Sequence, residues 1–233
     1  LFILPVMAQG EGFSESFDDP SLPDWEHSPE VIVAEGVLRI TPGNFAARMG
    51  SWEDFDLTLE MRFDNPGVSE IHYHTSDGGG YMLAISPDYL ALVRTGEPGT
   101  EPSELAGAAL DGLAAGQWID VGITVSGGQH TITLDGAELL TADVPDPIVA
   151  GGLLFASHGE RTTELDNILL TVTPALGGGE AATQLPPAPE IQPATTSVPP
   201  TWQELIDSLG STQGSTLDLP TFAVNLCLAV VTS

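Results

Sequence analysis

Apolar and polar residues alternate along several short stretches of the chain, and this pattern most constrains the fold. Residues 57–63, 120–125 and 131–134 each place apolar side chains at every second position. This period of two is typical of strands with one buried face, and residues 13–173 contain no long amphipathic helix pattern. The alternation therefore predicts strands rather than helices.

Turn-forming residues separate these stretches. Gly-rich or Asn/Asp-rich turns stand at residues 64–67, 77–80, 126–128 and 135–136. We count about 12 candidate strands at the spacing expected of an antiparallel sandwich. The Ala/Gly/Leu-rich stretch 103–116 is expected to be a loop or a short helical turn. The sequence thus predicts an all-β fold with two packed sheets.

The segments outside this region predict a membrane-tethered layout. Residues 1–8 resemble the end of a secretory signal, with Val6-Met7-Ala8 before the cleavage point, although they also fit a first strand. Residues 9–174 form the predicted sandwich, and residues 175–200 are a Pro/Thr/Ala-rich linker that we expect to be disordered. Residues 201–210 are an expected amphipathic helix, and 217–233 the start of a transmembrane segment, or else a buried element.

The charge of the chain excludes one class of partner. It has 33 acidic residues against five Arg and no Lys, which gives a formal net charge of −28. Nucleic-acid binding depends on cationic side chains that replace phosphate counterions, so we expect none. The single cysteine, Cys227, allows no disulfide within the chain.

Several short motifs, in order, resemble a known fold family. They open, bridge and close the predicted sandwich: Phe17–Pro20, Trp25, Glu35–Ile40, Gly116–Trp118, Val121–Val125, Ile132–Gly136, Gly151–Phe155 and Leu165–Ile168. Together they resemble concanavalin A-like (laminin G-like) jelly rolls, and most closely the bacterial 3-keto-disaccharide hydrolase domain. The resemblance implies a jelly-roll sandwich and, by the family name, activity on modified disaccharides.

One departure from that family argues against catalysis. The Gly-Tyr pair of the family matches Gly80-Tyr81, but the Glu and Gln that follow there correspond to Met82 and Ala84 here. The loss removes polar groups from the pocket that the resemblance implies. The chain also lacks the Glu-x-Asp-x-x-Glu strand of related glycosidases. We therefore expect a domain without enzymatic activity.

Histidines mark the first candidate ligand site. If Ile71 and Tyr73 face the core, His72 and His74 both point to the opposite sheet face. Their imidazoles could bind sugar hydroxyls or a metal, with His158 as the third candidate, or could simply be solvated.

Aromatic residues and one arginine extend this candidate site. Trp52, Tyr81, Tyr73 and Tyr89 could stack on sugar rings, or could belong to the core. The predicted ligand-binding set consists of His72, His74, Tyr81, Arg94, His158 and Trp52.

A structural Ca²⁺ is expected where the first and last strands meet. Ca²⁺ prefers several carboxylate and carbonyl oxygens, and Asp18 and Asp166 are the predicted carboxylates. The alternative is that both side chains only cap neighbouring strands.

These observations favour a lectin-like, carbohydrate-binding module that lies outside the cytoplasm and is tethered to the membrane. The alternatives are a glycoside hydrolase-like enzyme acting on modified disaccharides, and a spacer or protein-interaction domain of a larger membrane protein.

Overall fold

The computed structural model describes residues 10–76, 78–96, 100–148 and 150–173. The predicted signal remnant, the linker, the amphipathic helix and the start of a transmembrane segment fall outside these ranges. Within them, no helix is long and apolar enough to cross a membrane.

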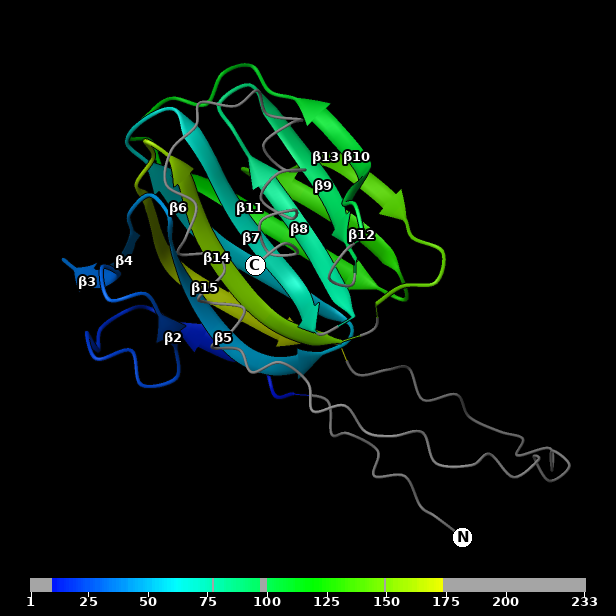
Figure 1. The fold of residues 1–233 in the computed structure, drawn as a ribbon, viewed down its shortest axis with the longest axis horizontal. Helices are drawn as coiled ribbons and strands as arrows, with labels where there is room; N and C mark the ends of the chain where they lie inside the picture. Colours follow the sequence, from blue (N-terminus) through cyan, green and yellow to red (C-terminus); the bar gives the residue numbers. More distant parts are fainter. Residues whose placement is uncertain (1–9, 77, 97–99, 149, 174–233) are drawn as a thin grey trace, which may run out of the picture.

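The described part of the chain folds into two antiparallel sheets that lie face to face (Figure 1). In order across the eight-stranded sheet lie β13 (Ala137–Asp143), β12 (Gln129–Leu134), β11 (Ile119–Ser126), β6 (Phe55–Phe63), β15 (Thr163–Val172), β4 (Val37–Ile40) and β3 (Ile32–Ala34), and β1 (Phe13–Glu15) also pairs with β15. In order across the seven-stranded sheet lie β10 (Ser103–Ala109), β9 (Tyr89–Thr95), β8 (Gly79–Ile85), β7 (Gly67–Ser76), β14 (Gly151–Gly159), β5 (Asn44–Trp52) and β2 (Glu26–His27). The predicted all-β, two-sheet sandwich is confirmed.

Alternation fixes which face of the eight-stranded sheet is buried. In β6 and β11 the apolar residues are buried, and the intervening polar residues are exposed or half-buried. Register keeps this pattern across strands, since Leu57 lies opposite Ile123 and Leu59 opposite Val121. One face of the sheet therefore packs on the core and the other meets solvent.

The turn residues act as the sequence indicates. Asp135 and Gly136, between β12 and β13, have φ angles of 49° and 75°. Two successive positive φ angles are those of a tight hairpin turn, which favours Asp-Gly.

One expected loop is a strand. Residues 103–109 form β10, an edge strand that pairs with β9, instead of a loop or helical turn. Small residues suit this pairing: a Cβ added to Gly107 would lie 2.0 Å from the Tyr89 hydroxyl, so a larger residue there would displace the Tyr89 side chain. The Tyr89 hydroxyl donates to Glu104 of the same edge strand, at 2.8 Å.

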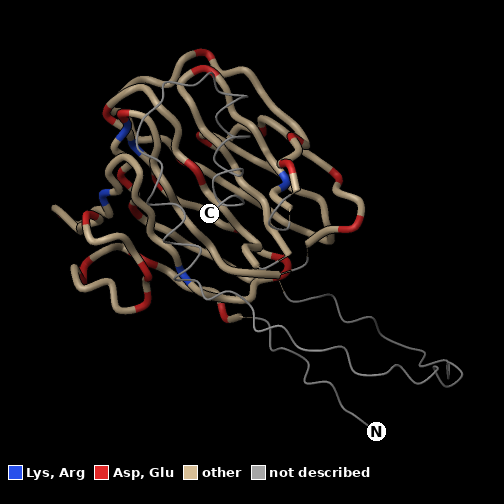
Figure 2. Tube along the Cα trace, viewed as in Figure 1, with Lys and Arg blue, Asp and Glu red and all other residues tan. Residues whose placement is uncertain are grey.

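Aromatic residues fill one end of the core. Trp25 lies 5.9 Å from the Phe155 ring and 6.0 Å from the Phe17 ring, measured between centroids. Each buried aromatic side chain of this kind stabilises the fold by roughly 2 kcal/mol through removal of apolar surface from water. Acidic residues are spread over the outside of the fold, with few cationic positions among them (Figure 2).

Candidate ligand-binding site on the seven-stranded sheet

A carboxylate and two imidazoles meet on the outer face of the seven-stranded sheet, the face turned away from the eight-stranded sheet. Strand alternation places Ile71 and Tyr73 of β7 in the core and leaves Glu70 and His72 on the outer face. The neighbouring strand β14 contributes His158, opposite Val68 in register. We call Glu70, His72 and His158 the Glu70 cluster.

The contacts within the Glu70 cluster converge on one oxygen. Glu70 Oε2 lies 2.8 Å from His72 Nε2 and 3.3 Å from His158 Nε2. The Glu70 side chain is 1% exposed, and the two imidazoles are 16% and 12% exposed. Glu70 Oε1 is buried and has no hydrogen-bond partner in the described part of the chain. One oxygen of the carboxylate is thus enclosed without a hydrogen-bond partner among the described residues.

Burial and pairing act in opposite directions on the charges of this cluster. Burial by itself would raise the pKa of Glu70, but the imidazoles of His158 and His72 outweigh it, and the pKa lies well below its ordinary value. Burial would likewise lower the pKa of His158, yet the Glu70 carboxylate raises it above 6.5. A carboxylate and an imidazolium therefore stabilise each other at a site of low dielectric constant.

Apolar side chains flank the Glu70 cluster on both sides. Along the outer face, register places Ala84 and Ala156 beside Glu70, and Met82 and Leu154 beside His72. These residues belong to two apolar clusters, one formed by Val68, Met82, Ala84, Ala91 and Val93 and the other by Phe45, Ala47, Leu154 and Ala156. The four residues beside Glu70 and His72 are at most 5% exposed, so buried apolar groups enclose one polar centre.

His74 does not share this face, and the expectation that both imidazoles point to the face opposite the core is wrong. His74 has a φ of 52°, and the β7–β8 register shifts between Tyr73 and Ser76. The irregularity turns the side chain inward, where its ring nitrogens lie 2.7 Å from the Ile148 carbonyl and 2.9 Å from the Glu53 carbonyl. His74 is 2% exposed and serves the core.

The predicted aromatic ligand residues are also placed in the core. Tyr81 is fully buried, stacks on Tyr73 at 5.5 Å, and its hydroxyl accepts from the Ile148 amide. Trp52 is 3% exposed and donates to the Glu11 carbonyl at 3.0 Å. Neither side chain presents its ring on the outer face, so the core alternative describes both.

Arg94 and the predicted calcium ligands lie apart from the Glu70 cluster. Arg94 donates to the carbonyls of Pro145 and Asp146, at 3.4 and 3.0 Å, and so fastens a loop. Asp18 accepts from the Ser16 hydroxyl, and Asp166 accepts from the Asn167 amide. In the residues that the structure describes, no group of three or more His, Cys, Asp or Glu side chains is arranged to hold a metal.

Glu70 is the site residue that sequence reasoning missed. The sequence carries the signal, because Glu70 and His72 are two residues apart and strand alternation places them on one face. The contact with His158 required the β7–β14 pairing, which joins segments nearly 90 residues apart.

Comparisons with solved structures show the same fold. Carbohydrate binding module CBM66 from Bacillus subtilis matches with a TM-score of 0.54 and 14% identity, over 64% of this chain and 95% of that one. The β-glucanase of Bacillus licheniformis matches with a TM-score of 0.58 and 12% identity, over 70% of this chain and 99% of that one. The exoplasmic/lumenal domain of VIP36, in its Ca²⁺/Man3GlcNAc-bound form, matches with a TM-score of 0.56 and 13% identity, over 72% of this chain and 93% of that one.

A comparison with curated protein sequences gives no match. The predicted resemblance, in contrast, is confirmed by a family match that spans both sheets. The 3-keto-alpha-glucoside-1,2-lyase-like domain matches residues 12–171, more than half of the chain, and the protein belongs to this family.

Proposed function

We propose that this protein is a carbohydrate-binding module whose ligand lies on the outer face of the seven-stranded sheet. The observation that carries the proposal is the buried Oε1 of Glu70, which lies beside two imidazoles and has no hydrogen-bond partner among the described residues. An acceptor kept out of water without a partner costs free energy. A ligand hydroxyl that donates to Oε1, once the side chains that close it off from solvent move aside, recovers that cost.

The surroundings of Glu70 favour a saccharide over other ligands. A sugar ring carries hydroxyls, which both donate and accept and therefore suit a carboxylate beside the partly exposed imidazoles of His72 and His158. The net charge of −28 disfavours anionic ligands at long range. Similarity of fold to a carbohydrate-binding module and to a Man3GlcNAc-bound lumenal domain supports the same ligand class.

A glycan array probed with the full chain tests this proposal. We expect selective binding that falls at least tenfold in Glu70→Gln, because the amide weakens the acceptor and breaks the charge pairing. Asp120→Asn is the matched control, since Asp120 is an exposed carboxylate on β11 of the other sheet. Equal binding by both variants would contradict the assignment of the site.

The predicted layout and calcium site complete the proposal. We propose that the module acts outside the cytoplasm, tethered to a membrane through residues 217–233, as the composition of the chain ends supports. We retain Asp18 and Asp166 as proposed Ca²⁺ ligands. Excess Ca²⁺ is then expected to raise the Tm of the chelator-treated protein, and an unchanged Tm would contradict this.

A second candidate function is lyase-like chemistry at the same site. A 1,2-elimination removes a proton from C2 of a 3-keto-glucoside, breaks the C1–O bond, and leaves a C1–C2 double bond. The His158 imidazolium, with its raised pKa, is placed to protonate the leaving oxygen, and Glu70 to accept the proton from C2. The lowered pKa of Glu70 makes it a weak base, which ranks this function second.

A chromogenic 3-keto-α-glucoside distinguishes the two functions. Binding without catalysis predicts no release of the aglycone by the full chain. The lyase alternative predicts release that falls about 100-fold in His158→Asn, as expected for loss of a general acid. His27→Asn is the control, because His27 is exposed on β2.

A further inference from the structure

A pocket lies at the ends of β4, β6 and β15, on the solvent side of the eight-stranded sheet. Its volume is about 390 Å³, and its lining residues are Arg39, Arg62, Phe63, Asp64, Gly116, Thr162 and Glu164. Pockets for small ligands begin at roughly 300 Å³, so this one has room for a single sugar ring. It belongs to the sheet opposite the one that carries the Glu70 cluster.

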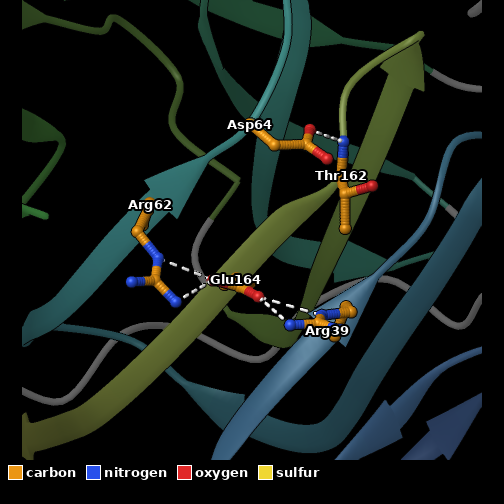
Figure 3. Close-up of polar contacts among 5 residues, drawn as sticks. All are labelled: Arg39, Arg62, Asp64, Thr162 and Glu164. Carbon is orange, nitrogen blue, oxygen red and sulfur yellow. Dashed lines mark hydrogen bonds and ion pairs between the residues drawn. The ribbon is translucent and has the colours of Figure 1, made fainter. Parts of the chain in front are cut away.

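A row of three ion-paired side chains lies in this pocket: Arg39, Glu164 and Arg62 (Figure 3). We call this row the ledge. Glu164 lies directly opposite Arg39 on β4 and Arg62 on β6. Arg39 donates from Nε and Nη2 to Glu164 Oε1, at 2.9 and 2.5 Å, and Arg62 binds Oε2 in the same way, from Nε at 2.6 Å and from Nη2. The Arg62 guanidinium also stacks on Trp118, 4.5 Å from the ring centroid. These contacts fix both arginines before any ligand arrives, which reduces the entropy cost of binding.

The pocket keeps hydrogen-bond donors and acceptors for which the described residues show no hydrogen-bond partner. Both arginines bind Glu164 through Nε and Nη2, which leaves each Nη1 as a donor. Asp64 accepts from the Thr162 amide through Oδ1 at 2.7 Å, which leaves Oδ2 as an acceptor. Arg39 and Arg62 are 39% and 33% exposed, so these groups reach solvent. Free donors and free acceptors therefore lie around one hollow.

The charge of the pocket decides which ligands suit it. Among the residues that line the pocket, the two guanidiniums are balanced by the carboxylates of Glu164 and Asp64. Asp64 also interacts electrostatically with the buried Arg161, and the rest of the chain is strongly acidic. An anion gains nothing from a balanced site and is repelled at long range, while a cation meets two guanidiniums. Hydroxyl groups donate and accept at once, and they carry no charge.

We propose that the pocket between Arg39, Arg62, Asp64 and Glu164 is a second binding site, which takes a neutral polyol such as an uncharged sugar ring. The module then has two sites on opposite sheets and can hold two sugar residues or two chains. The alternative is a ladder of cross-strand ion pairs that only stabilises the sheet.

Binding by the full chain and its variants, measured by calorimetry, tests the second site. The probes are the neutral saccharides that score highest on a glycan array, and a glucuronate-containing saccharide serves as the anionic probe. Asp64→Asn keeps Oδ1 for the Thr162 amide but replaces the free acceptor, and Arg39→Gln removes one free donor. Arg48→Gln is the control, because Arg48 also contacts two carboxylates, Glu15 and Asp24, outside the pocket.

We expect two binding events for neutral saccharides, of which Asp64→Asn and Arg39→Gln each weaken one at least fivefold, while Glu70→Gln weakens the other. A pocket that serves only stability predicts unchanged binding in both pocket variants, and that result would overturn the second site while leaving the first intact. If the pocket variants lose saccharide binding and Glu70→Gln binds as the unchanged protein does, the first site alone would be overturned. Tighter binding of the glucuronate probe would contradict the neutral ligand class.

Discussion

The fold buries the charged carboxylate of Glu70, and the imidazole of His158 offsets the free-energy cost of removing that charge from water. Removing one partner of a buried ion pair costs about 3 kcal/mol or more, because the remaining charge is left without compensation. The two imidazoles thus have a structural role as well as a proposed ligand role. The same pairing links the stability of the protein to pH.

We expect the free energy that the Glu70 cluster contributes to be largest between about pH 4.5 and pH 6.5. His158 has a raised pKa, so its contribution is complete below 6.5 and is lost as pH rises through the folded-state value. Glu70 has a lowered pKa, so its contribution is complete above 4.5 and is lost as pH falls. Urea unfolding of the protein and of His158→Asn, repeated across pH, measures the difference. A difference that does not vary with pH would contradict the pairing.

His130 affects the pH dependence of stability in the opposite direction to His158, because the core holds the His130 imidazole neutral. Its Nδ1 lies 2.9 Å from the Tyr73 hydroxyl and its ring 4.3 Å from Tyr81. Burial, followed by repulsion from His74, lowers its pKa to about 4. The unfolded chain then binds a proton more readily, so stability falls as pH drops from about 6.5 to about 4.

We therefore expect His130→Gln to flatten the acid side of the stability curve, even though it lowers stability at pH 7. Tm recorded from pH 4 to pH 8 measures the slope. His27→Gln is the control, since His27 is exposed, and it should leave the slope unchanged. An unaltered acid slope in His130→Gln would show that other groups govern acid unfolding.

At the scale of the strands, alternation predicted much of the fold. The buried faces of β6, β11 and β12 and the Asp135-Gly136 hairpin follow from sequence, because each depends on neighbours a few residues apart. The inward turn of His74 does not follow, since it depends on a positive φ and a register shift imposed by another strand. The alternation of side chains between the two faces of a strand does not predict their direction where the strand is irregular.

The close approach of β14 to β7 beside His74 requires glycine. A Cβ added to Gly151 would lie 2.3 Å from the His74 carbonyl carbon and 2.5 Å from the Thr75 oxygen. Backbone cannot yield to such contacts, so we expect Gly151→Ala to cost about 1–3 kcal/mol or more. Gly78→Ala is the control, because its nearest atom is 3.7 Å away. Urea midpoints measure both, and equal midpoints would refute the packing constraint.

For the molecule as a whole, sequence predicted the family and the sandwich but only part of the site. His72 and His158 were predicted, and the structure brings them together around Glu70. Tyr81 and Trp52 were misplaced, because whether an aromatic side chain faces the core depends on sheet packing. The Arg39–Glu164–Arg62 ledge was not predicted, since it requires two non-local strand pairings.

The strand pairings of the sandwich close within residues 13–172, so we expect residues 9–174 to fold without the rest of the chain. The truncated protein should keep the near-ultraviolet circular dichroism of its buried aromatic residues and unfold cooperatively. Size-exclusion chromatography combined with a thermal melt provides the measurement. Aggregation or a non-cooperative melt would contradict the predicted domain boundary.

The most direct test of the central claim is an NMR titration of the five histidines in the full chain. The titrant is a neutral saccharide selected on the glycan array, and the imidazole carbon–proton signals are followed. We predict that His72 and His158 shift in a saturable way, while His27 and His130 do not. Saturable shifts that spare His72 and His158 would contradict a ligand site on the outer face of the seven-stranded sheet.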